Sequence, residues 1–213
     1  MSTNKKIKIL IADDHPIIRK GLRQIINDEP DMEVVSEVSD GFDALEKLRK
    51  HKFDIAILDI SMPKKTGVEI LEQLKLERIK TRILILSVYS EEQYALRVIK
   101  TGAKGYLTKE SAPDELVKAI RKIIEGETYI SAIIAEKVLS DLIVDNRKLH
   151  QSLSNREYSV MILIAKGLTL KEMSYQLNIN VKTISTYRKR IMDKMKMNSN
   201  AQLILYCQEN KLL

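Results

Sequence analysis

The sequence predicts an α/β domain with a doubly wound, five-stranded parallel sheet, followed by a second, smaller all-α domain. Two observations support this organisation. Short apolar runs rich in β-branched residues alternate with longer amphipathic stretches until Gly126, and from Leu153 onward every stretch has helical character. The length of 213 residues leaves room for one large domain or two small ones.

Five short apolar runs are the candidate strands, and a helical stretch follows each of them. The runs Ile-Ala-Ile-Leu from Ile55 and Ile-Leu-Ile-Leu from Ile83 are continuously apolar, which is typical of parallel strands buried on both faces. In chain order, the predicted strands are Ile7–Ala12, Met32–Val38, Ile55–Asp59, Arg82–Ser87 and Gly105–Leu107. The helices predicted to follow them are Pro16–Asn27, Gly41–Lys50, Gly67–Glu77, Glu91–Thr101 and Pro113–Glu125.

The second part of the chain has clear signals for helix starts. Ser154 precedes Glu157 by three residues, and Thr169 precedes Glu172 in the same way, so each pair predicts a capping box. Gly167 ends the first of these helices. A longer helix is expected over Val181–Met195 and a last one over Asn200–Asn210. We therefore expect a first domain over residues 5–127, a linker over 128–150 with a short helix in 131–144, and a helical domain over 151–213.

Composition excludes several classes of protein. Hydrophobic residues make up 44% and charged residues 31% of the chain, which argues against wholesale disorder. The apolar run Ile7–Ala12 is too short for a signal peptide, and no run is long enough to span a membrane, so we expect a cytoplasmic protein. The one cysteine, Cys207, cannot form an internal disulfide and is expected to be buried. The three histidines are scattered and suggest no metal cluster.

Polar side chains follow the predicted strands at their carboxyl ends, where ligands bind in open parallel sheets. Asp13 and Asp14 follow the first strand, Asp59 ends the third, Ser87 ends the fourth and Lys109 follows the fifth. If the strand order is 2-1-3-4-5, the first and third strands are neighbours and three carboxylates converge in one cleft. Carboxylates this close require a cation at neutral pH, and an all-oxygen ligand set suits Mg²⁺.

The same residues suggest phosphoryl chemistry. Asp59 lies deepest along its strand, and carboxylates can form aspartyl phosphates. Lys109 would bring a positive charge to one phosphoryl oxygen, and the Ser87 hydroxyl would hydrogen-bond another. Each residue alone has a simpler explanation, namely a helix cap at Asp13 and Asp14, a turn residue at Asp59 and a surface lysine at Lys109. Their joint occurrence at successive strand ends favours the phosphoryl site.

These motifs resemble the receiver domain of two-component response regulators over about residues 5–127. The matching residues are Asp13-Asp14, Asp59-Ile-Ser-Met-Pro, Gly67, Ser87, Tyr106 and Lys109. The family has a flavodoxin-like sheet. Two positions depart from its common pattern, Ser87 where threonine is commoner and Glu110 where many relatives have proline.

The resemblance also implies roles for single residues. Asp59 would be phosphorylated by a sensor histidine kinase. Mg²⁺ would be bound by Asp14, Asp59 and the main-chain carbonyl of Ser61, and by Asp13 largely through water. Ser87 and Tyr106 would form the pair whose coupled movement carries the signal.

The predicted helix over Val181–Met195 has two contrasting faces. At 100° per residue, one face is mainly apolar and carries Val181, Ile184, Arg188, Ile191, Met192 and Met195. The roughly opposite face carries Lys182, Thr186, Lys189 and Arg190, with Ser185 on the flank. An apolar stripe behind a basic face with hydroxyl groups suits a helix in the DNA major groove. The alternative is a solvated basic helix on a protein-interaction domain.

Charge supports the DNA interpretation, because residues 149–213 hold 10 of the 36 basic side chains but only 4 of the 29 acidic ones. Residues 153–213 resemble the four-helix DNA-binding domain of the LuxR/NarL (FixJ-like) type. The matching residues are Leu153-Ser-Asn-Arg-Glu157, Gly167-Leu-Thr, Lys171-Glu-Met, Leu177 and Val181-Lys-Thr-Ile-Ser-Thr-Tyr-Arg188. By this resemblance, Thr169–Leu177 and Val181–Met195 form the helix-turn-helix. Ser185, Thr186 and Lys189 then approach bases, and Lys182, Arg188 and Arg190 approach phosphates.

Together the two halves predict a DNA-binding transcriptional response regulator, rather than an enzyme, that is switched by phosphorylation of Asp59 in a two-component phosphorelay. The expected partners are double-stranded DNA, a sensor histidine kinase and, in the phosphorylated state, a second copy of the chain. A magnesium phosphatase with an aspartate nucleophile is disfavoured, because Ser61 stands where such enzymes have a second aspartate. A phosphorylated adaptor whose helical end binds protein is the other alternative.

Overall fold

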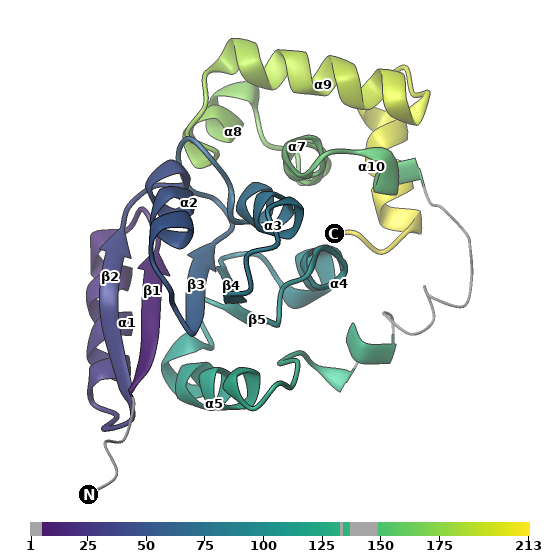
Figure 1. Cartoon of the computed structure of the whole chain (residues 1–213). Coiled ribbons are helices and arrows are strands. Elements are labelled where there is room, and N and C mark those ends of the chain that lie inside the picture. The colour runs from purple at the N-terminus through teal and green to yellow at the C-terminus, as the bar shows by residue number, and fades with distance from the viewer. Residues whose placement is uncertain (1–5, 133, 137–148) are drawn as a thin grey trace, which may run out of the picture. The chain divides into compact units, whose positions relative to one another are not determined.

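The computed structural model describes residues 6–132, 134–136 and 149–213. The chain divides into two compact units, Met1–Leu139 and Ser140–Leu213 (Figure 1). Of the linker helix expected over 131–144, Ala132 and residues 134–136 are helical, and the part beyond them lies outside the described residues. In the described part of the chain, no helix is long and apolar enough to cross a membrane.

The first unit is built on a five-stranded sheet of order β2-β1-β3-β4-β5, with every neighbouring pair parallel (Figure 1). The strands are β1 (Ile7–Ala12), β2 (Met32–Val38), β3 (Ile55–Asp59), β4 (Arg82–Ser87) and β5 (Gly105–Thr108). The predicted fold class, strand order and first four strands are confirmed. The fifth strand is one residue longer than predicted, because Thr108 still pairs with Ser87.

Helices cover both faces of this sheet. They are α1 (Pro16–Asn27), α2 (Gly41–Lys50), α3 (Gly67–Leu76), α4 (Glu91–Thr101) and α5 (Ala112–Ile124). Helices α1 and α5 pack together on one face, and α2, α3 and α4 follow one another on the other (Figure 1). Three predicted boundaries of these helices were wrong by one residue. Helix α3 ends at Leu76, just before Arg78 takes a left-handed conformation, and α5 begins and ends one residue early.

The core explains why β3 and β4 contain continuous apolar runs. Together with β1 they are the central strands of the sheet, and all three are buried from Ile9, Ile55 and Ile83 to their carboxyl ends. On the side of α1 and α5 the core is made by Ile9, Ile11, Leu22, Ile26, Ile55, Ile57, Leu84, Leu86, Leu116 and Ile120. Burial on both faces fixes the strands in register. The first polar residues at their carboxyl ends are therefore held at one edge of the sheet.

The second unit is helical throughout its described part. It contains a short 3-10 turn, Leu149–Ser152, and helices α7 (Asn155–Ala165), α8 (Leu170–Gln176), α9 (Val181–Met195) and α10 (Asn200–Glu209). Both predicted capping boxes are confirmed, one at Ser154 and one at Thr169. Gly167 has a φ of +80°, the left-handed conformation that ends a helix. Helices α8 and α10 end one residue before the positions predicted.

Helix α7 is the centre of the second unit, since every one of its residues is buried and both α9 and α10 pack against it. Helix α9 contributes Ile184, Ile191 and Met195 to this core. Cys207 on α10 is fully buried, as expected, and burial raises the pKa of its thiol to about 11. The packing leaves the other side of α9 exposed.

We predict opposite effects on stability from the same substitution at two glycines of the first unit. A Cβ at Gly41 would lie 1.9 Å from the backbone oxygen of Lys65, whereas a Cβ at Gly21, inside α1, would meet nothing within 4 Å. Gly41→Ala should therefore lower the free energy of unfolding by about 1–3 kcal/mol. Gly21→Ala should raise it by about 0.5–1 kcal/mol. Urea denaturation followed by circular dichroism measures both, and a stable Gly41→Ala variant would contradict the close approach.

Candidate functional site

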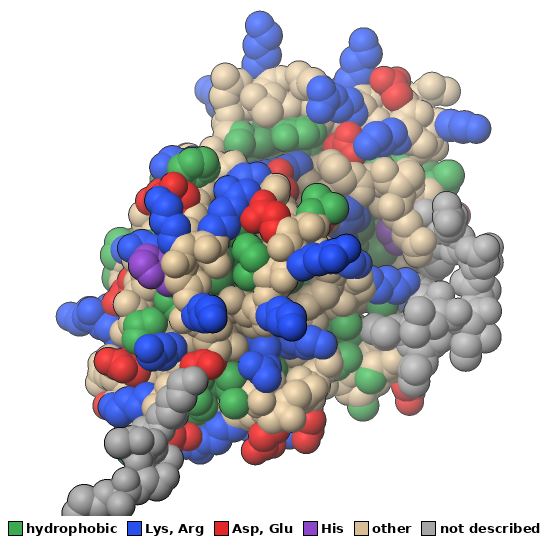
Figure 2. Space-filling model, viewed as in Figure 1, with side chains coloured by type: hydrophobic (Ala, Val, Ile, Leu, Met, Phe, Trp, Pro, Cys, Tyr) green, Lys and Arg blue, Asp and Glu red, His purple; other side chains and the backbone are tan. Residues whose placement is uncertain are grey.

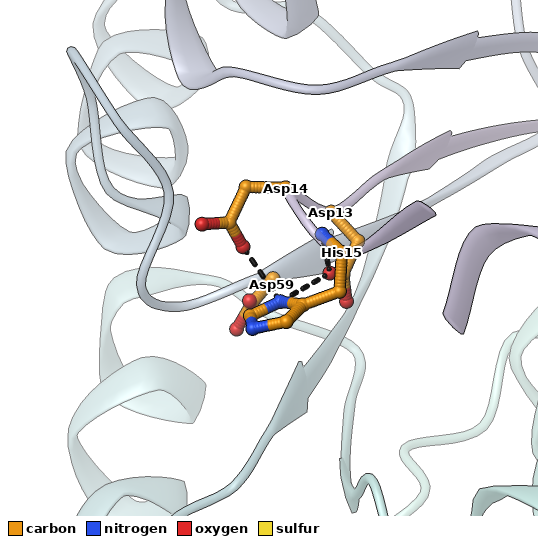
Figure 3. Close-up of side chains that lie close together, drawn as sticks. All are labelled: Asp13, Asp14, His15 and Asp59. Carbon is orange, nitrogen blue, oxygen red and sulfur yellow. Dashed lines mark hydrogen bonds and ion pairs between the residues drawn. The ribbon is translucent and has the colours of Figure 1, made fainter. Parts of the chain in front are cut away.

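The acidic residues at the ends of β1 and β3 meet in one cluster. Ligand atoms of Asp13, Asp14, His15 and Asp59 all lie within 4.8 Å of one another (Figure 3). Asp13 and Asp59 are almost fully buried, at 1% and 2% exposure. The cluster forms because β1 and β3 are neighbours in the sheet, as the predicted strand order required.

Lys109 joins the two buried acids. Its Nζ lies 2.7 Å from Oδ2 of Asp13 and 2.8 Å from Oδ2 of Asp59. The Lys109 N–H donates to the Ser87 carbonyl at 2.7 Å, which fixes the backbone where the lysine leaves β5. Burial lowers the pKa of Lys109, but the charges and hydrogen bonds of Asp59 and Asp13 outweigh it, so the net shift is upward. Lys109 therefore carries its positive charge inside the cleft.

The pKa of Asp59 is raised, mainly by burial and further by the negative charge of Asp13, while Lys109 opposes the shift. The Ser61 N–H donates to Oδ1 of Asp59 at 3.1 Å. Oδ2 of Asp59 lies within 2.8 Å of Lys109. Both carboxylate oxygens are therefore oriented by neighbouring donors. Such a carboxylate is charged at a free-energy cost, and a bound cation would reduce that cost.

Ser87 and Tyr106 lie beside this cleft on β4 and β5. Ser87 is fully buried, and its Oγ accepts from the Tyr89 N–H at 3.1 Å. The Tyr106 hydroxyl is turned inward and donates to the Tyr89 carbonyl at 2.7 Å. Burial raises the pKa of Tyr106, while a hydrogen bond with the Ser87 side chain opposes the shift. Ser87 and Tyr106 therefore share Tyr89 as a partner.

The donor set fits a hard divalent cation. Oδ1 of Asp14 is a buried oxygen that accepts no hydrogen bond, although Nδ1 of His15 lies at ion-pair distance, and Oδ2 of Asp13 is a buried oxygen whose neighbour is the Lys109 ammonium group at 2.7 Å. Acceptors left in this way are suited to coordinate a cation, and carboxylate oxygens are the ligands that Mg²⁺ prefers. The residues present therefore fit the ion expected from the sequence.

His15 is the member of this cluster that sequence reasoning missed. Its Nδ1 lies 3.0 Å from Asp13 and 2.8 Å from Asp14, and its side chain is 60% exposed (Figure 3). The prediction that the histidines belong to no group of possible metal ligands was wrong for His15. The sequence did place His15 directly after Asp13 and Asp14, which could have indicated a shared site. Neighbours in the sequence share a site only when the backbone turns between them. Here the His15 N–H donates back to Oδ1 of Asp13 at 2.8 Å and closes such a turn.

The second candidate site is the exposed face of α9. Lys and Arg side chains project from the surface over this helix (Figure 2). All six residues predicted to contact DNA are exposed, namely Lys182, Ser185, Thr186, Arg188, Lys189 and Arg190. The hydroxyls of Ser185 and Thr186 donate to the carbonyls four residues earlier, at 3.2 and 3.0 Å. Their oxygens remain able to accept further hydrogen bonds.

The apolar face of α9 is narrower than predicted. Val181 is 39% exposed because it begins the helix, and Met192 is only half-buried. Arg188, placed with the apolar set, is exposed, and its Nε donates to Oδ1 of Asn200 at 2.8 Å. This hydrogen bond to α10 fixes the position of the Arg188 guanidinium.

An ion pair fixes α9 against α7. Nζ of Lys194 lies 2.6 Å from Oε2 of Glu157, whose side chain is almost fully buried. Burial raises the pKa of Glu157, but the Lys194 and Ser154 hydrogen bonds lower it more, so the net shift is downward. The sequence indicated only the capping role of Glu157. The partner on α9 could not be predicted, because 37 residues separate the two.

A doubly wound domain with an acidic cleft, joined to a domain with a helix-turn-helix, defines the DNA-binding two-component response regulators. The pattern of the response regulator receiver domain matches residues 9–121, and that of the luxR family of bacterial regulatory proteins matches residues 151–207. The chain belongs to both families. It is therefore a DNA-binding response regulator of the LuxR type.

Named relatives match the chain over nearly its whole length. The oxygen regulatory protein NreC of Staphylococcus epidermidis is 35% identical over 216 residues, which cover 97% of this chain and 99% of NreC. Among solved structures, RcsB from Salmonella enterica serovar Typhimurium, bound to promoter rprA in the presence of the phosphomimetic BeF3⁻, has a TM-score of 0.62 and 25% identity, with coverage of 95% and 98%. A structure of two RcsB dimers bound to two parallel DNAs has a TM-score of 0.58 and 25% identity, with coverage of 96% and 98%.

We predict that Glu157→Gln weakens the second unit in a pH-dependent way. A carboxylate whose pKa is lowered on folding stabilises the fold above its unfolded pKa, and this contribution is lost as pH falls through the folded pKa. Glutamine keeps the capping box but loses the ion pair with Lys194. At pH 7 the variant should lose about 1–2 kcal/mol, and the difference should shrink toward pH 3.

Glu172→Gln is the matched control, because Glu172 closes the other capping box at an exposed position. Amide exchange of α7 and α9 in the full chain measures both variants. An equal loss in the two would contradict a special role for the ion pair.

Proposed function

We propose that this regulator is switched in the cytoplasm by phosphorylation of Asp59 by a sensor histidine kinase, with Mg²⁺ in the acidic cleft. The observation that carries the proposal is the position of Lys109, which reaches both Asp13 and Asp59 within 2.8 Å in a buried cleft. An aspartate held by a lysine beside further carboxylates suits phosphoryl acceptance. The limits proposed for the parts are 5–127 for the receiver, 128–150 for the linker and 151–213 for the DNA-binding domain.

Each residue of the cleft would act in the transfer through its own atoms. An oxygen of Asp59 would attack the phosphorus of the kinase's phosphohistidine, the P–N bond would break, and the imidazole would leave with its electron pair. The Ser61 N–H orients the Asp59 carboxylate from 3.1 Å. Lys109 offsets charge on a phosphoryl oxygen, and the Ser87 hydroxyl donates to another. Asp14, Asp59 and the Ser61 carbonyl would hold Mg²⁺, with Asp13 acting through water. The ion supplies positive charge that offsets the charge of the transferred group.

The signal would pass from Ser87 to Tyr106. If the Ser87 hydroxyl turns toward a phosphoryl oxygen, it leaves the Tyr89 N–H, and Tyr89 also bonds the Tyr106 hydroxyl. We propose that the phosphorylated form is a homodimer that binds double-stranded DNA. Two observations on relatives support this: RcsB binds a promoter in the presence of a phosphomimetic, and it forms dimers on DNA.

The exposed face of α9 would enter the major groove. Ser185, Thr186 and Lys189 would then reach base edges. Lys182, Arg188 and Arg190 would contact phosphates, and the bond from Arg188 to Asn200 favours a fixed backbone contact over base reading.

Labelling with acetyl phosphate tests the phosphoacceptor. We expect the parent protein to take up one phosphoryl group in the presence of Mg²⁺, and Asp59→Asn to take up none while keeping its circular dichroism spectrum. Asp54→Asn is the control, since Asp54 lies on the loop before β3, at the far end of that strand. Labelling of Asp59→Asn at the parent's rate would sink the proposal. Steady release of phosphate from a small phosphomonoester would favour the phosphatase alternative.

Binding to duplex DNA tests the roles on α9. Lys189→Ala should weaken binding to the operator by about 1–3 kcal/mol and relax the preference at one base pair. Lys182→Ala should weaken binding to operator and random DNA nearly equally and reduce the salt slope by about one. Salt titrations on both DNAs measure these effects. Binding of the parent that does not depend on salt would favour the adaptor alternative, in which the helical domain binds protein.

A further inference from the structure

The loop between β3 and α3, residues 60–66, is attached to the start of α2. The Gly41 N–H donates to the Pro63 carbonyl at 3.1 Å, and a Cβ at Gly41 would lie 1.9 Å from the Lys65 oxygen. The Lys65 N–H donates to the same Pro63 carbonyl at 2.7 Å. The backbone of the loop therefore lies directly against the first residue of α2.

A side-chain ion pair closes this attachment. Oδ2 of Asp40 accepts from Nζ of Lys64 at 2.6 Å. The other oxygen of Asp40 accepts from the N–H groups of Phe42 and Asp43, both at 2.9 Å, and so caps α2. Asp40 is 8% exposed. One carboxylate thus binds the start of a helix on one side and the loop on the other.

Lys64 occupies an unusual backbone conformation for this role. Its φ is +64°, in the left-handed region. Glycine adopts this backbone conformation freely, whereas a residue with a Cβ adopts it at a cost in free energy. Two residues later the loop ends at Thr66, which caps α3 through a capping box with Glu69. Lysine at this position gains a tether to Asp40 that glycine would lack.

We propose that Asp40 and Lys64 are positioning residues for the cation site, because their ion pair holds the loop that presents the Ser61 carbonyl. This inference rests on the proposed function, in which that carbonyl is a Mg²⁺ ligand. Neither side chain is a ligand itself. Mg²⁺ requires near-ideal octahedral geometry, so a loop that moves by a fraction of an ångström binds it less well. The two residues that flank the loop already lie close together. A Cβ on Gly67 would lie only 2.5 Å from the backbone oxygen of Asp59.

Three substitutions separate the tether from the other roles of these residues. Lys64→Gly removes the ion pair and relieves the left-handed backbone, so it does not act through strain. Asp40→Asn keeps an oxygen for the N-cap of α2, where asparagine is as good as aspartate, but removes the charge. Lys64→Arg keeps the charge. Lys50→Ala is the control, because it removes an exposed ion pair with Glu46 on the same helix α2.

Isothermal titration calorimetry with MgCl₂ on the full chain gives the first readout. We expect Lys64→Gly and Asp40→Asn to raise the Kd for Mg²⁺ by about two- to fivefold, the range for a partly exposed ion pair. Lys64→Arg and Lys50→Ala should keep the parent value. Amide exchange without Mg²⁺ gives a second readout, in which the Gly41 and Lys65 N–H groups exchange faster in Lys64→Gly than in the control. Saturating Mg²⁺ should restore the acetyl phosphate labelling rate of both weakened variants.

The outcomes distinguish this inference from the proposed function. If the parent binds Mg²⁺ and Lys64→Gly and Asp40→Asn bind it with the same Kd, the positioning role is overturned and the cation site stands. If the parent binds no Mg²⁺ at millimolar concentration, the proposed cation site fails and the positioning role fails with it. If Lys50→Ala raises the Kd for Mg²⁺ as much as Lys64→Gly does, the positioning role is also overturned. The loss of affinity would then come from the change in net charge.

Discussion

The contact of one buried ammonium group with two buried carboxylates is the interaction on which the receiver depends. Asp13 and Asp59 end neighbouring central strands and would repel each other without Lys109 between them. Lys109 follows β5, which pairs with β4, the neighbour of β3. From there its side chain reaches both acids. The three residues lie in distant parts of the sequence. The parallel strands bring their carboxyl ends to one edge of the sheet, and the order 2-1-3-4-5 makes β1 and β3 neighbours there.

The helical domain depends on a comparable contact, which serves a different purpose. Glu157 closes the cap of the fully buried helix α7 and also binds Lys194, near the end of α9. Apolar packing by Ile184, Ile191 and Met195 holds α9 in place, and the ion pair adds a directional contact at one end. The basic face is therefore presented by a rigid helix, as base reading requires.

Much of this structure follows from local sequence. The strand bounds were predictable because apolar β-branched runs stop at polar residues. Two helix starts were predictable because the caps at Ser154 and Thr169 depend only on near neighbours in the sequence. The meeting of the acidic residues followed from their places at the predicted strand ends, on the condition that the strand order is 2-1-3-4-5, which the structure confirms. Contacts that a side chain makes across a loop could not be predicted from the sequence. The pair Asp40–Lys64 and the position of His15 belong to this class, because no periodic pattern links their partners.

Tyr106 connects the cleft to the residues that follow the receiver. Its hydroxyl donates to the Tyr89 carbonyl, while its N–H donates to the Tyr129 carbonyl at 3.1 Å. The Ser131 N–H then donates to Oε1 of Glu91, the first residue of α4, at 2.8 Å. Residues 129–131 thus cover the edge of β5 and bind the segment that begins just after Ser87. The Tyr106 side chain is therefore bonded to the segment that follows Ser87, while its backbone is bonded to residues 129–131. Because Ser131 is also bonded to the first residue of α4, residues 129–131 are joined by hydrogen bonds to both elements that flank Tyr89.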